Sequence, residues 1–176
     1  MKNLYHLPAG SNLPEVIHVV IEVPRGSANK YEYDKNLGVI KLDRVLYAAM
    51  QYPGDYGFIP STLGGDGDPL DALILSTHPF LPGVLVECRV LGMLEMSDDK
   101  GRDEKILAVP ADDPRWDDLQ TLTDVRSHRL AEIEHFFLEY KTLEGKSVNS
   151  EGWRSKEDAL ACIIDAIERA KKQPQE

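Results

Sequence analysis

Apolar and β-branched residues gather in six short runs over the first two-thirds of the chain. These runs lie at 16–23, 30–34, 39–45, 72–76, 84–96 and 104–109. Turn residues separate several of them, at 24–27, 35–38, 82–83 and 98–101. Apolar runs bounded by Gly, Pro, Asn and Asp are typical of β-strands. Short strands at this spacing predict a closed or nearly closed antiparallel barrel.

The last third of the chain has a helical period. Apolar residues recur every three or four positions at 127–140 and again at 156–171, which places them on one face of each helix. Ser155, with Asp158 three residues later, predicts a cap at the start of the second helix. We therefore expect an α+β fold, rich in β-structure, in which helices flank the barrel and one domain spans residues 1–176.

Composition and charge restrict the partners. The formal net charge of -10 argues against nucleic acid and anionic membranes, because phosphate-rich surfaces select basic proteins. The two cysteines, Cys88 and Cys162, lie among apolar residues, which favours buried thiols in a reducing compartment. The first residues lack the continuous apolar stretch of a signal peptide, and the run at 16–23 is too short to span a bilayer. We expect a cytoplasmic protein without a nucleic-acid or membrane partner.

The densest chemical signal is an acidic loop. Asp66, Asp68 and Asp71 fall within six residues, in a segment that glycines bend and Pro69 stiffens. Taken alone, such a triplet is typical of a solvated turn. An EF-hand is excluded because Asp71 stands at the sixth position, which requires glycine, and Thr77 stands at the twelfth, which requires glutamate. Carboxylates in a bent loop suit Mg²⁺, which shares its shell between a few carboxylates, water and substrate phosphates.

Other charged residues are placed to join this loop. Asp98 and Asp103 flank a predicted hairpin turn, so their carboxylates can approach one metal. Lys105 lies two residues after Asp103, on the same strand face, and Lys30 and Glu32 share a face in the same way. The candidates for phosphate binding carry a cation or a hydroxyl group: Lys30, Arg44, Lys105, Lys141, Tyr52, Tyr56 and Tyr140.

These motifs together resemble a known family. The segment 66–72, Asp-Gly-Asp-Pro-Leu-Asp-Ala, matches the signature of the Mg²⁺-dependent first family of soluble inorganic pyrophosphatases, and the chain is similar to the bacterial members. The resemblance extends over nearly the whole chain, through 21–27, 29–33, 43–44, 52–58, 98–110, 135–137, 140–141 and 151–153. The segment 142–150 does not align clearly with the family.

The resemblance implies a role for each candidate. Asp66, Asp71 and Asp103 would hold the most tightly bound metal, and Asp71 would also ligate a second ion. Asp98 would join Asp103 on a metal that arrives with substrate, while Glu22 and Glu32 would be direct or water-mediated ligands. Asp68 would be the general base that contacts the attacking water. The phosphates would be bound by Lys30, Arg44, Lys105, Tyr56, Tyr140 and Lys141, with Tyr52 in support.

The same resemblance implies an activity and an architecture. The activity is hydrolysis of pyrophosphate to two orthophosphates by metal-activated water, with several Mg²⁺ ions and no covalent intermediate. The architecture is a five-stranded barrel of the oligonucleotide- and oligosaccharide-binding (OB) type with flanking helices, assembled in bacteria as a homohexamer.

Two other functions remain open from the residues alone. A metal-dependent phosphatase acting on short polyphosphates or nucleotides would need room beyond two phosphates. A non-catalytic barrel that binds oligonucleotides is opposed by the net charge and by the lack of a basic groove lined with aromatic residues.

Overall fold

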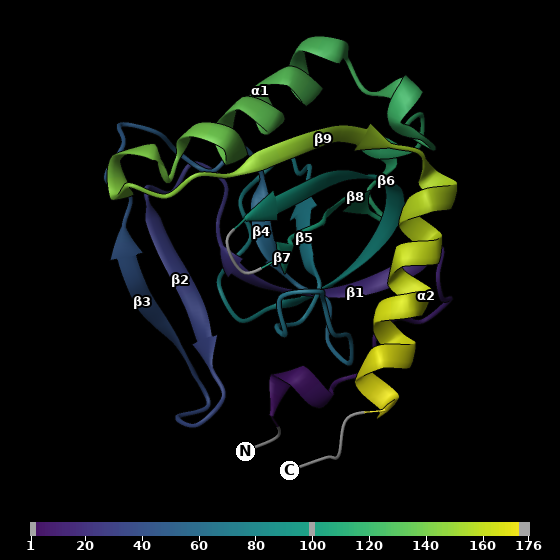
Figure 1. Ribbon diagram of the computed structural model, residues 1–176. Coiled ribbons are helices and arrows are strands. Elements are labelled where there is room, and N and C mark those ends of the chain that lie inside the picture. The colour runs from purple at the N-terminus through teal and green to yellow at the C-terminus, as the bar shows by residue number, and fades with distance from the viewer. Residues whose placement is uncertain (1–2, 99–100, 173–176) are drawn as a thin grey trace.

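The computed structural model describes residues 3–98 and 101–172, which form nine strands and two α-helices (Figure 1). The strands are β1 (Val16–Val23), β2 (Asn29–Asp34), β3 (Val39–Val45), β4 (Asp55–Phe58), β5 (Asp71–Ile74), β6 (Leu85–Asp98), β7 (Gly101–Arg102), β8 (Lys105–Pro110) and β9 (Asn149–Arg154). The helices are α1 (Ser127–Glu139) and α2 (Lys156–Lys172). Both predicted helices are therefore confirmed to within one residue at each end.

Five strands pair in a cycle. β1 pairs with β4, β4 with β5, β5 with β8, β8 with β6, and β6 with β1 again. The expectation of wholly antiparallel pairing was wrong for β5 and β8, which are parallel. Parallel neighbours need a long connection between them, and here that connection contains the 14-residue strand β6. Periodicity predicts a strand but does not identify its partner.

β2 and β3 form a separate two-stranded sheet, which stands beside the cycle in Figure 1. Three strands were not predicted: β4, β9 and the short β7, which begins within the predicted turn at 98–101. β4 lies in a segment rich in proline and glycine, and β9 has no clear apolar alternation, so neither carries the usual strand signal. β9 is held in place by antiparallel pairing with β6.

The two helices cover different parts of the core. Ala159, Ile163 and Ala166 of α2 pack into one cluster with residues of the strand cycle, and the small alanines allow close approach. Ile133 and Phe137 of α1 pack into a second cluster. The predicted cap of α2 is confirmed, because the Ser155 hydroxyl accepts from the Asp158 backbone N–H at 3.2 Å and the Asp158 carboxylate accepts from the Ser155 N–H at 3.2 Å. Neither helix of the described residues combines the length and the apolar character that crossing a bilayer requires.

Asp55, at the start of β4, is fully buried and joins three segments. It accepts from the backbone N–H groups of Arg25 at 3.1 Å and Phe80 at 2.9 Å, and from the hydroxyl of Ser76. We expect Asp55→Ala to lower the free energy of unfolding by about 3 kcal/mol, because buried donors lose their acceptor. Urea denaturation measures this change.

The matched control is Asp118→Ala, since Asp118 is exposed. Its free energy of unfolding should stay within about 0.5 kcal/mol of the parent. A loss below about 1 kcal/mol for Asp55→Ala would show that Asp55 does not hold these segments together.

Candidate active site

The centre of the candidate site is the buried ammonium group of Lys105. β5 and β8 run parallel with Asp71 directly opposite Lys105, so strand register brings these two residues together. The Lys105 ammonium donates to Asp71 at 2.5 Å, to the Tyr56 hydroxyl at 3.0 Å, and to Asp103. The Tyr56 hydroxyl also donates to Asp71 at 2.5 Å. Asp103 and Lys105 are therefore neighbours, as predicted, although β8 begins only at Lys105 and Asp103 lies outside the strand.

Electrostatics keeps Lys105 charged and Tyr56 protonated. Burial alone would lower the pKa of Lys105, but the charges of Asp71 and Asp103 raise it above its usual range. Burial, followed by the charges of the same two aspartates, raises the pKa of Tyr56 well above its usual value. Near neutral pH the site therefore presents one fixed cation and one phenolic O–H donor beside two carboxylates.

The carboxylates of Asp66, Asp71 and Asp103 line one small pocket together with Glu104. Burial raises the pKa of Asp66, and the charges of Asp71 and Asp103 raise it further, although a hydrogen bond from the backbone N–H of Asp68 lowers it. Carboxylates this close repel one another, and a divalent cation would relieve the repulsion. Their oxygens are the donors that Mg²⁺ prefers.

The donor chemistry fits a metal, but the arrangement differs from the one expected. Within residues 3–98 and 101–172, no three acidic, histidine or cysteine side chains are grouped so that they could hold a metal ion. Instead, Lys105 contacts both Asp71 and Asp103. The lysine supplies the positive charge between these carboxylates, so a bound metal would have to compete with it.

Asp68 is presented by a tight loop next to this pocket. The Asp68 backbone N–H donates to the Asp66 carboxylate at 3.1 Å, and the Asp68 carbonyl accepts from the Gly64 N–H at 2.7 Å. Gly67, between Asp66 and Asp68, has a φ of 92°, a backbone conformation that residues other than glycine rarely adopt. The backbone of Asp68 is thus fixed while the residue stays exposed to solvent.

Glu22 lies on β1 and is buried. Its carboxylate accepts from the Tyr33 backbone N–H at 2.6 Å. Burial raises the pKa of Glu22 to about 8, and the charge of Asp71 raises it while Tyr33 and Lys30 lower it. Near neutral pH this carboxyl group is largely protonated, so a cation bound there would have to displace a proton.

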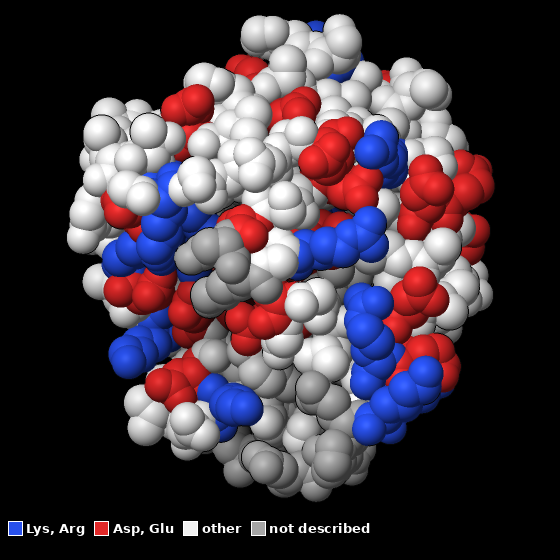
Figure 2. Space-filling model, viewed as in Figure 1, with Lys and Arg blue, Asp and Glu red and all other residues white. Residues whose placement is uncertain are grey.

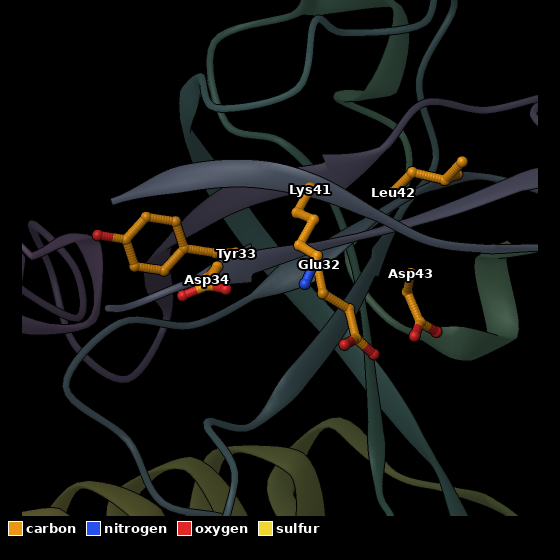
Figure 3. A pocket seen from close by; sticks show the side chains of 6 residues that line it. All are labelled: Glu32, Tyr33, Asp34, Lys41, Leu42 and Asp43. Carbon is orange, nitrogen blue, oxygen red and sulfur yellow. The ribbon is translucent and has the colours of Figure 1, made fainter. Parts of the chain in front are cut away.

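The hairpin of β2 and β3 carries a second group of charges. Lys30 and Arg44 are opposite each other in the strand register. Lys30 contacts Glu32, as expected from their shared face, and also Asp43 at 3.4 Å. Figure 3 shows the carboxylates of Glu32 and Asp43 on the same side of the hairpin, where they border a pocket of about 170 Å³. Figure 2, viewed from the same side as Figure 1, shows basic and acidic side chains interspersed over the surface.

Three tyrosines form one wall with the aromatic residues of α1. The rings of Tyr52 and Tyr56 lie 5.3 Å apart, and Phe136 stacks on Tyr140 at 5.0 Å. Burial raises the pKa of Tyr140 above its usual range, and the charges of Lys105 and Arg44 act in the opposite direction. The hydroxyl of Tyr52 is buried without a hydrogen-bond partner in the part of the chain that the structure describes.

Lys141 follows α1 and contacts Asp98 at 3.5 Å, with both side chains largely buried. This contact joins the end of β6 to the end of α1. The turn predicted between Asp98 and Asp103 includes residues 99–100, which lie outside the described residues. Asp98 is thus placed beside a candidate phosphate-binding lysine.

Two carboxylates of the site were not assigned roles from the sequence. Asp43 contacts both Lys30 and Arg44, and its position beside Arg44 was the only signal. Glu144 accepts from Arg44 at 2.7 Å although 100 positions separate them in the chain. Glu144 lies in the segment 142–150 that did not align, so no motif pointed to it.

Comparisons with known proteins identify the family of the chain. The sequence profile of the inorganic pyrophosphatase family matches residues 19–171. The inorganic pyrophosphatase of Thermus thermophilus is 58% identical, covering 97% of this chain and 99% of that protein. A crystal structure of that organism's enzyme superposes with a TM-score of 0.94 at 57% identity, over 97% of this chain and 99% of that one. The inorganic pyrophosphatase structure from Helicobacter pylori has a TM-score of 0.89 at 44% identity, over 92% of this chain and 97% of that one.

The family match spans most of the chain, and the identity to the Thermus relative holds over nearly its whole length. The β-rich fold with few helices is also that of the solved relatives. The chain therefore belongs to the inorganic pyrophosphatase family, as a member of the bacterial type, and hydrolyses pyrophosphate to phosphate.

Proposed function

We propose that this chain cleaves pyrophosphate with several Mg²⁺ ions in each active site, by metal-activated water and without a covalent intermediate. The observation that carries the proposal is the cluster of Asp71, Asp103, Lys105 and Tyr56 beside Asp66. It combines oxygen donors for a hard cation with cationic and hydroxyl donors for phosphate.

The carboxylates divide into two sets. Asp66, Asp71 and Asp103, which line one pocket, would hold the tightest metal. Asp98, Glu22 and Glu32 would serve the further ions, directly or through water. Bound Mg²⁺ would neutralise phosphate oxygens and lower the pKa of a coordinated water from about 16 to about 7. The family is metal-dependent, which agrees with this donor set.

The remaining residues bind the substrate and move the proton. Asp68 accepts a proton from the attacking water while the water oxygen forms a bond to one phosphorus atom. The bond from that phosphorus to the bridging oxygen breaks, and the second phosphate leaves with its charge stabilised by cations. The groups assigned to phosphate binding are Lys30, Arg44, Lys105, Tyr56, Tyr140 and Lys141, with Tyr52 in support.

A comparison of substrates tests the proposal. The cations assigned to phosphate binding suit a small symmetric anion, so we expect kcat/KM for pyrophosphate to exceed that for triphosphate and ATP by about 100-fold or more. The measurement is phosphate release with Mg²⁺ at neutral pH. Comparable values for ATP would favour a broader metal-dependent phosphatase instead.

We also propose a barrel fold, an assembly and a cellular location for this chain. The cycle of five paired strands supports a closed OB-type barrel within one domain spanning residues 1–176. Large apolar side chains that are exposed in the single chain support burial in an assembly: Leu37, Tyr47, Leu81 and Leu143. Cys88 and Cys162 are free thiols, which supports a cytoplasmic location.

We expect the native protein to sediment as a homohexamer. Its mass should be near six times the 19.7 kDa of one chain. Analytical ultracentrifugation at micromolar concentration and neutral pH measures this. A species with the mass of a single chain would rule out the hexamer.

A further inference from the structure

Two carboxylates hold the guanidinium group of Arg44 from different sides. Arg44 Nε donates to Glu144 Oε1 at 2.7 Å, and Arg44 Nη1 donates to Asp43 Oδ2 at 2.5 Å. The Glu144 side chain is only 7% exposed. Because these contacts use Nε and Nη1, the two N–H groups of Nη2 remain for an acceptor other than this pair.

The Arg44 side chain is only 20% exposed, although the strand that carries it is poorly packed. β3 is mostly exposed, and it pairs with β2 in a sheet separate from the strand cycle. A long side chain on such a strand samples many rotamers unless something restricts it. A charge-assisted hydrogen bond to Nε fixes the plane of the guanidinium as well as its place. Glu144 makes this bond from another part of the chain.

Glu144 belongs to the same short segment as two other candidate phosphate ligands. It ends a 3-10 helix (Thr142–Glu144) that follows Tyr140 and Lys141 directly. Gly145 closes this turn with a φ of 72° and an N–H donated to the Thr142 carbonyl at 3.0 Å. The contact between Arg44 and Glu144 therefore fixes the hairpin relative to the end of α1, and so fixes Arg44 relative to Tyr140 and Lys141.

We propose that Glu144 is a positioning residue, which holds Arg44 so that the Nη2 edge is presented to a phosphate of the substrate. This inference rests on the proposed function, because it takes Arg44 as a phosphate ligand. Glu144 would not contact the phosphate, since two anions repel each other. It restricts Arg44 before binding, so its loss should weaken binding more than it slows the chemical step.

Kinetics of full-length variants test the inference. We expect Glu144→Ala to raise KM for pyrophosphate by about tenfold while kcat changes less than about twofold. Glu144→Gln keeps an oxygen acceptor and should raise KM less than Glu144→Ala does. In Arg44→Ala/Glu144→Ala, KM should be no higher than in Arg44→Ala alone, because Glu144 acts only through Arg44.

Glu139→Ala is the matched control. Glu139 is exposed and accepts from the Thr142 hydroxyl at 3.1 Å, so it lies by the same segment without contacting Arg44. Its KM should equal that of the parent. A normal KM in Glu144→Ala together with a raised KM in Arg44→Ala would overturn the positioning role of Glu144 but leave the proposed role of Arg44 intact. The same conclusion would follow if the increase in KM of the double variant equalled the product of the increases in the two single variants. A normal KM in Arg44→Ala would overturn both the inference and the proposed role of Arg44.

Discussion

Asp68→Asn should lower kcat for pyrophosphate hydrolysis by about 100- to 10,000-fold, the usual contribution of a general base. The amide of asparagine has nearly the same shape as the carboxylate but does not take up a proton at neutral pH. The two hydrogen bonds that fix residue 68 use its backbone N–H and carbonyl, which the substitution keeps. The fold and the tight binding of metal should therefore survive.

Steady-state kinetics at neutral pH measure the effect, with calorimetric Mg²⁺ titration and thermal unfolding of the same variant. The matched control is Asp118→Asn, because Asp118 is exposed and has no place in the site. Its kcat should equal that of the parent. A near-normal kcat in Asp68→Asn would remove Asp68 from the role of base, and a large loss of metal affinity would assign it to the ligands instead.

Much of the fold follows from local patterns. β1 and β3 have the bounds that apolar runs predict, and α1 and α2 follow the helical period closely. Local patterns do not determine which strands pair with each other, so the parallel pairing of β5 and β8 could not be predicted. β4 and β9 are strands because their neighbours pair with them, and their own residues gave no signal.

The candidate site likewise combines contacts that local patterns predict with contacts that they do not. Strand periodicity correctly placed Lys30 beside Glu32, and Lys105 contacts Asp103 as predicted although Asp103 lies outside β8. It could not show that Lys105 also contacts Asp71, since this depends on pairing between strands that are distant in sequence. The contact between Arg44 and Glu144 arises only when the hairpin and the end of α1 meet. Roles that depend on such distant contacts need the folded structure.

Metal ions should be required for activity, and they should not be interchangeable. The proposed ligands are carboxylates, which accept both Mg²⁺ and Ca²⁺. Mg²⁺ holds near-octahedral geometry at oxygen distances of about 2.1 Å, whereas Ca²⁺ is larger and takes about six to eight ligands. Misplacement of reacting groups by about 1 Å can slow a reaction about 100-fold. We therefore expect Ca²⁺ to compete at Asp66, Asp71 and Asp103 and to inhibit hydrolysis supported by Mg²⁺.

A metal titration of the stripped enzyme tests most directly whether these carboxylates hold catalytic magnesium, as we propose. Phosphate release from pyrophosphate is measured after chelation of divalent ions, then with rising free Mg²⁺, and then with Ca²⁺ added at fixed Mg²⁺, correcting for the calcium–pyrophosphate complex. We predict no activity in the stripped enzyme, full recovery with Mg²⁺ and inhibition by Ca²⁺. Activity that survives strong chelation, or full activity with Ca²⁺ alone, would contradict the account.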